Sequence, residues 1–238
     1  RGIILSGPPG TGKTMIAKSM ASETEATTIL ISAEMIQQRN DIKSAFRLAR
    51  KLAPTLIIIE DIDTAGTVSR RFADHPILGE YLQAMDGIEA NEGVVVLATT
   101  NHTENIDPAI SDRPGRFDRI IEVPLPDLNQ RINILSNLLS KMPTDNISFG
   151  LRNKNFFGNE TISQIGRDAK HLSGAWIREI VHTAFIFATY DGRSSIRADD
   201  LKAALMDVKE RRGLAYKSTP NLEHNYRESD SDLNNLFV

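Results

Sequence analysis

One short segment constrains the fold of this chain more than any other. It reads Gly7-Pro8-Pro9-Gly10-Thr11-Gly12-Lys13-Thr14, it follows an apolar run at residues 2–6, and a helical pattern continues from Met15. Strand, glycine-rich loop and helix form the context in which G-x-x-x-x-G-K-[ST] binds phosphate. Glycines let backbone N–H groups close around an anion, and the helix N-terminus adds positive potential. The segment therefore predicts a phosphate-binding loop rather than an ordinary Gly/Pro turn, with Lys13 on the phosphates and Thr14 on Mg²⁺.

The bulk composition excludes several classes of protein. The 238 residues are 40% hydrophobic and suit one large domain or a domain with a satellite, and the net charge of −3 does not favour nucleic acid as a partner. Cysteine is absent, which excludes disulfides, thiol chemistry and a cysteine zinc site. The longest apolar stretch, residues 175–190, contains Arg178, Glu179 and His182, so we expect a buried helix and no membrane span. We expect a fragment or processed form, because the chain starts at Arg1, and an intracellular, cytoplasmic location, because no targeting signal is visible.

The first half of the chain alternates between strand and helix patterns. The apolar runs are rich in Ile and Val and do not alternate with polar residues, as is typical of parallel strands covered on both faces. This order predicts an α/β fold with a parallel sheet. The expected strands are residues 2–6, 27–31, 56–60, 94–99 and 120–123, and the expected helices are residues 13–22, 41–52 and 76–85.

Beyond residue 127 the pattern becomes entirely helical. Asp127 is a good helix N-cap, and Gly213 is a good C-terminal stop. We therefore expect an α/β domain at residues 1–127, a small all-α domain at residues 128–212 and a polar tail at residues 213–238. The expected helices of the second domain are residues 127–141, 161–172, 174–190 and 198–211.

Polar residues follow two of the expected strands. Ligands of parallel sheets bind at the carboxyl ends of the strands, which directs attention to Glu60 and Asp61 at the end of one strand and Asn101 after another. Carboxylates in that position serve Mg²⁺ and the attacking water, and the phosphate loop favours this role over the alternative of a solvated acidic turn. Arg113 and Arg116 stand in an arginine-rich turn that is either solvated or an arginine finger acting on a phosphoryl group.

Several motifs match, in order and spacing, those of the AAA family within the AAA+ ATPases, which this chain resembles over residues 1–210. Besides the loop and residues 56–63, the matching segments are Met85-Asp86-Gly87-Ile88, Ala98-Thr99-Thr100-Asn101, Ile106-Asp107-Pro108-Ala109, residues 113–118 and Val123-Pro124-Leu125-Pro126-Asp127. The resemblance implies a five-stranded parallel-sheet P-loop ATPase domain followed by a helical lid. It also implies bound ATP and Mg²⁺, and a homo-oligomeric, usually hexameric ring with ATP sites at subunit interfaces.

The resemblance assigns roles by position. Residues 7–15 would bind the nucleotide, Thr14 and Glu60 the magnesium ion, and Glu60 and Asp61 would form the Walker B pair. Asn101 would be sensor 1, and two arginines would act on the ATP of a neighbouring subunit: Arg113 and Arg116. From the lid, the expected nucleotide contacts are Ile134, Gly174 and Ala175.

The chain departs from the family pattern at three places. Most relatives have Asp then Glu at the end of Walker B, whereas this chain has Glu60 then Asp61, an order similar to that of the mitochondrial complex III assembly branch. The shorter Asp61 would lie further from the attacking water, and we expect slow but real hydrolysis. Residues 36–41 lack the aromatic loop of relatives that thread polypeptides, and Arg70 and Arg71 are more simply solvated than pore-lining. In the lid, Trp176 replaces a usual Asp, and we expect it in the core.

Two classes of function remain open at this stage. The first is an ATP-hydrolysing module that remodels or disassembles a protein partner, which the sequence does not identify. The second is a scaffold that assembles on binding ATP and hydrolyses little, as the acid order of Glu60 and Asp61 would favour. A small-molecule kinase is disfavoured by the expected trans arginines, and a helicase is disfavoured by the lack of a basic or aromatic stacking surface.

Overall fold

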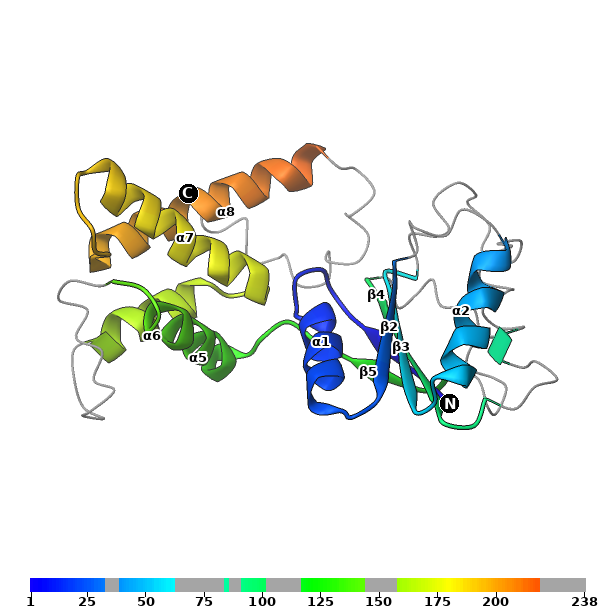
Figure 1. Ribbon diagram of the computed structural model, residues 1–238. Helices are drawn as coiled ribbons and strands as arrows, with labels where there is room; N and C mark the ends of the chain where they lie inside the picture. The colour runs from blue at the N-terminus through cyan, green and yellow to red at the C-terminus, as the bar shows by residue number, and fades with distance from the viewer. Residues whose placement is uncertain (33–38, 63–83, 86–90, 102–116, 144–157, 219–238) are drawn as a thin grey trace. The chain divides into compact units, whose positions relative to one another are not determined.

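The computed structural model describes residues 1–32, 39–62, 84–85, 91–101, 117–143 and 158–218. The chain forms two compact units, Arg1–Leu125 and Pro126–Val238, and each is described by itself (Figure 1). No helix within the described ranges is long and apolar enough to cross a membrane.

The first unit is built on a five-stranded, all-parallel sheet in the order β2-β3-β4-β1-β5. The predicted α/β fold with a parallel sheet is therefore confirmed. The register pairs Ser6 at the end of β1 with Thr100 at the end of β4, and Ile59 of β3 with Ala98 of β4. The ends of three strands thus lie at one edge of the sheet. The strands are β1 (Gly2–Ser6), β2 (Thr27–Ser32), β3 (Thr55–Glu60), β4 (Val94–Thr100) and β5 (Phe117–Glu122).

Two helices cover opposite faces of this sheet (Figure 1). Helix α1 (Lys13–Glu23) packs Ala17 onto one face, where it shares a cluster with Leu5, Leu56, Ile58 and Leu97. Helix α2 (Arg39–Lys51) packs onto the other face, where the cluster includes Ile42, Phe46, Ala49, Ile57 and Val96. Only residues 84–85 of the helix expected at 76–85 are described, and they are helical.

The edge strands differ from the prediction that all five strands would be buried. Leu30 on β2 is 51% exposed, and Ile120 and Ile121 on β5 are 42% and 45% exposed. An edge strand has a neighbouring strand on one side only, so its side chains have fewer packing partners than those of β1, β3 or β4. β5 also begins earlier than expected, at Phe117, which is buried in the core.

The second unit is helical in its described part. Its core contains Leu135, Ile165, Ile177, Ala184 and Leu205, and Trp176 packs against that core as predicted. The predicted N-cap is confirmed, because Asp127 accepts a hydrogen bond from the N–H of Gln130 and the Gln130 side chain accepts one from the N–H of Asp127. The helices are α5 (Leu128–Leu139), α6 (Gly158–Asp168), α7 (Gly174–Tyr190) and α8 (Ala198–Ser218).

The predicted helix stop at Gly213 is wrong, because α8 continues to Ser218. One glycine costs only about 1 kcal/mol in a helix. Leu214 and Ala215 directly after it are strong helix formers, so the favourable hydrogen bonding of the next turn outweighs that cost. The tail predicted from residue 213 therefore begins inside a helix, and residues 219–238 lie outside the described ranges.

Candidate active site

The glycine-rich loop has the backbone geometry that an anion-binding loop requires. Gly7, Gly10 and Gly12 have φ angles of 143°, 75° and 106°, which residues with a Cβ atom rarely adopt. Gly12 is also the N-cap of α1. Because glycine has no side chain to accept hydrogen bonds from the first turn of the helix, this end of α1 suits an oxyanion ligand.

Lys13 is folded into the loop that it follows. Its ammonium nitrogen Nζ donates hydrogen bonds to the carbonyl oxygens of Gly7 at 2.7 Å and Pro8 at 2.9 Å. The residue is 5% exposed, and Thr11 closes the same turn by donating from Oγ1 to Pro8 O at 2.9 Å. A buried cation inside a ring of backbone groups is a strong attraction for phosphate oxygens, because the surrounding protein screens the charge poorly.

The start of the loop lies against the end of the sheet. The N–H of Val123 donates to Ser6 O at 2.7 Å, and a Cβ atom placed on Gly7 would lie 2.3 Å from Val123 O. Only glycine fits at position 7, both because of this contact and because of its positive φ. The loop is therefore held on the sheet by a backbone contact that the sequence pattern does not reveal.

Glu60 has the character of a cation ligand. Its Oε1 atom is buried and accepts no hydrogen bond from the described residues, and it forms an ion pair with Lys18 of α1, whose Nζ lies 3.7 Å from that oxygen. A buried carboxylate oxygen without a donor is stabilised by a metal ion. Together with the Thr14 hydroxyl, Glu60 provides the oxygen ligands that Mg²⁺ prefers, so these residues fit the ion. No group of three or more His, Asp or Glu side chains that could hold a metal occurs in the described ranges, but Mg²⁺ on a nucleotide commonly uses one or two protein ligands and the phosphates.

Asp61 and Asn101 come together from two neighbouring strands. Asn101 donates from Nδ2 to Asp61 Oδ1 at 3.1 Å. Asp61 has a φ of 49°, in the left-handed region that aspartate accepts better than most residues. Its own N–H donates to Thr99 Oγ1 at 3.0 Å, and the N–H of Ile62 donates to Thr99 O at 3.0 Å.

Thr99 is the residue of this site that the sequence analysis missed. It is fully buried, with an exposed fraction of 0%. The sequence places Thr99 near the end of an apolar run and two residues before Asn101, and β4 itself ends at Thr100. The pairing of β3 with β4, which ends at Ile59 and Ala98, brings Thr99 to the turn that contains Asp61.

Other predicted residues remain untested. Arg113 and Arg116 lie outside the described residues, as do Arg70 and Arg71. The lid residues belong to the second unit, where Ile134 packs against the helical core and Gly174 begins α7, followed by exposed Ala175. Their contact with a nucleotide therefore stays a prediction.

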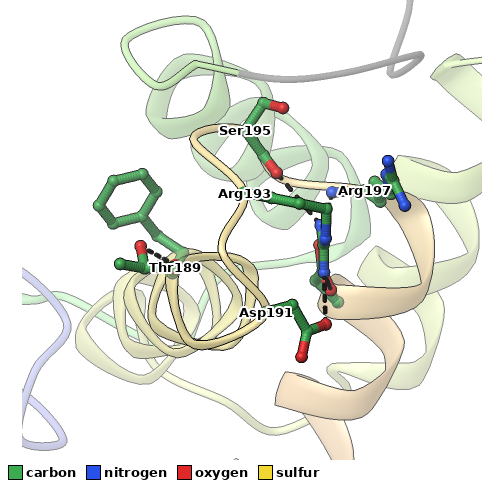
Figure 2. Close-up of polar contacts among 7 residues, drawn as sticks. Thr189, Asp191, Arg193, Ser195 and Arg197 are labelled. Atoms are coloured by element: carbon green, nitrogen blue, oxygen red, sulfur yellow. Dashed lines mark hydrogen bonds and ion pairs between the residues drawn. The ribbon is translucent and has the colours of Figure 1, made fainter.

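The second unit contains a separate charged cluster at the connection between α7 and α8 (Figure 2). Arg193 donates from both terminal nitrogens to the two oxygens of Asp200, each at 2.7 Å, and also reaches Asp191 at 2.9 Å. Asp200 in turn accepts from the N–H of Arg197 at 2.7 Å. The hydrogen bond from Arg193 lowers the pKa of Asp200, and burial only partly opposes it. The cluster ties the start of α8 to the preceding loop and has the character of a structural anchor.

Residues 3–125 match the family model described as the ATPase family associated with various cellular activities (AAA). Among curated proteins, the chain is similar to proteasome-activating nucleotidases: 35% identical over 89% of the chain and 54% of the protein from Saccharolobus solfataricus, and 34% identical over 95% of the chain and 53% of that from Methanocaldococcus jannaschii. The chain thus spans about half the length of the curated relatives it matches. Because the family match covers more than half of the 238 residues, the chain belongs to the AAA family of ATP-binding ATPases, as its motifs predicted.

Proposed function

We propose that this chain hydrolyses ATP at the edge of the sheet where β1, β3 and β4 end. One observation carries the proposal. The loop begins directly after Ser6, and Ser6 pairs with Thr100, the residue before Asn101, which in turn contacts Asp61. The register thus brings the phosphate loop next to a carboxylate and an amide, the groups that activate and orient a water molecule in phosphoryl transfer.

Each group has a distinct role in this proposal. The loop and Lys13 bind the phosphates, and Thr14 and Glu60 would hold Mg²⁺, which neutralises charge on the phosphate oxygens when it is bound. Asp61 accepts the proton of the attacking water as general base. Asn101 holds Oδ1 of Asp61 at 3.1 Å and so limits the rotation of the carboxylate.

We further propose that the module works in a ring and acts on a protein partner. The family resemblance supports a hexamer in which Arg113 and Arg116 reach the ATP of the neighbouring subunit. The name of the relatives, proteasome-activating nucleotidases, supports a protein rather than a nucleic acid as the partner. Because residues 36–41 contain no aromatic side chain, remodelling or disassembly suits this chain better than threading. The similarity of the acid order to the mitochondrial complex III assembly branch stays a prediction.

The test measures phosphate release from ATP as a function of protein concentration. Specific activity should rise with concentration as rings assemble, and Arg113→Ala should abolish it without weakening ATP binding. Arg119→Ala is the matched control, since Arg119 is an exposed arginine on β5. Asp61→Asn should lower turnover at least 100-fold, as removal of a catalytic base commonly does. Wild-type turnover in Asp61→Asn would refute the assignment of the base.

The alternative is a nucleotide-dependent scaffold with little hydrolysis. The short Asp61 carboxylate favours it, because a base displaced by about 1 Å can lose on the order of 100-fold in rate. Under this alternative, ATP binds tightly and the oligomer forms, but phosphate release stays near the background rate at every protein concentration. Sedimentation and phosphate release on the same samples separate the two functions.

A further inference from the structure

We propose that Thr99 is the positioning residue of the active site, and that it acts by fixing the backbone of Asp61. This inference rests on the proposed function, in which Asp61 is the general base. Thr99 does not touch the nucleotide in this proposal. It sets the turn after β3, and the turn sets where the carboxylate points.

The contacts converge on two successive residues of the turn. The Thr99 hydroxyl oxygen accepts from the N–H of Asp61, and the Thr99 carbonyl oxygen accepts from the N–H of Ile62, both at 3.0 Å. Thr99 itself is completely buried on β4, a central strand, so its position is determined by the core. The turn is therefore attached by its backbone to a rigid element.

The backbone of Asp61 needs this support. A φ of 49° places it in the left-handed region, which a residue with a side chain adopts only when its surroundings favour it. Without the Thr99 hydroxyl, the N–H of Asp61 loses an acceptor in a partly buried site, and the left-handed turn loses this support. A change in the backbone of Asp61 would then move its carboxylate relative to Asn101, which donates to Oδ1 at 3.1 Å.

The same geometry gives a reason for aspartate at position 61. Asp, Asn and His are enriched several-fold among non-glycine residues in the left-handed region, and Glu is not among them. The left-handed backbone at position 61 therefore favours aspartate over glutamate as the general base. The aspartate at position 61 is then a consequence of the turn rather than a sign of lost activity.

The experiment compares Thr99→Val, which keeps the shape and removes the hydroxyl, with Thr99→Ser, which keeps the hydroxyl. In the full chain, Thr99→Val should lower kcat at least tenfold while KM for ATP and the affinity for a fluorescent ADP analogue change less than twofold. Thr99→Ser should stay within about threefold of the wild-type kcat. The matched control is Thr55→Val at the other end of β3, where a buried hydroxyl donates to Ala49 O at 2.9 Å. Its kcat should not change.

A double variant separates positioning from general damage. If Thr99 acts through Asp61, adding Thr99→Val to Asp61→Asn should cause no further loss of kcat. A wild-type kcat in Thr99→Val, equal losses in the Val and Ser variants, or a further loss in the double variant would each overturn the role of Thr99. If Thr99→Val fails to bind the ADP analogue, Thr99→Ala takes its place under the same criteria. Full activity of Asp61→Asn would instead overturn the proposed function, so the two failures are distinguishable.

Discussion

Replacing Arg131 with methionine should destabilise the helical unit. Arg131 is 8% exposed, yet its guanidinium donates only to backbone carbonyls in the described contacts: from Nε to Gly166 O at 2.7 Å and from a terminal nitrogen to Pro126 O at 2.8 Å. Gly166 lies in the last turn of α6, where carbonyl oxygens lack partners within the helix. The arginine therefore joins the end of α6 to the residue before the cap of α5.

The magnitude follows from three contributions. A hydrogen bond to a charged group contributes about 1.5–3 kcal/mol, so the two bonds together contribute about 3–6 kcal/mol. Burial of the guanidinium opposes this, as the lowered pKa of Arg131 indicates, and methionine avoids that penalty while filling similar space. We expect a net loss of about 2 kcal/mol, mainly from the carbonyl of Gly166 left without its donor.

Unfolding in urea can be followed for this unit through the fluorescence of Trp176. It is the single tryptophan of the chain and packs against the helical core, so its fluorescence reports unfolding of that core. If the free energy of unfolding falls by about 2 kcal/mol per molar urea, the urea concentration at the unfolding midpoint should be about 1 M lower in Arg131→Met than in the wild type. The midpoint should fall by less in Arg131→Lys than in Arg131→Met, because lysine keeps the charge but cannot donate to both carbonyl oxygens as the guanidinium does.

Arg167→Met is the matched control on α6. Arg167 is exposed and makes one long hydrogen bond, to Gln164 at 3.3 Å, so its loss should change stability by less than about 0.5 kcal/mol. An Arg131→Met midpoint within 0.3 M of the wild type, a shift of roughly 0.6 kcal/mol at that slope, would refute the reasoning. It would mean that the desolvation penalty fully offsets the two hydrogen bonds.

Three further outcomes are expected. Gly7→Ala should abolish binding of a fluorescent ATP analogue, because the new Cβ would lie 2.3 Å from Val123 O; a calorimetric titration that still shows micromolar affinity would contradict this. Asp200→Asn should lower the urea midpoint at pH 7. Because Arg193 lowers the pKa of Asp200, the stabilisation by the Asp200 carboxylate is present above the unfolded-state pKa of about 4 and is lost as pH falls through the folded pKa. The urea midpoints of the wild type and of Asp200→Asn should therefore converge in acid. Gly213→Ala should raise the thermal midpoint, since alanine is better by up to about 1 kcal/mol in a helix and meets no described atom within 4 Å; an unchanged midpoint would mean that this part of α8 frays.

Local patterns were sufficient where the structure depends on neighbours in sequence. The runs that became β1 and β4 are apolar up to the polar residues at their carboxyl ends, and a period of 3.6 residues marked α7 with the bounds that the structure has. Gly213 misled the sequence analysis, because a glycine signals a helix end only when the following residues do not favour another turn.

By itself, the sequence determined the class of this protein: a phosphate loop between strand and helix, acids and an amide after the next strands, and the family to which they belong. These motifs are defined by residue types and spacing within short segments, so the sequence is enough to identify them. The tertiary structure decided which groups meet: Gly7 on Val123, Asn101 and Thr99 on Asp61, and Arg131 on the end of α6. Those contacts join residues 35 or more positions apart in the chain. The pairing of strands and the packing of helices bring them together, and no local pattern encodes that pairing.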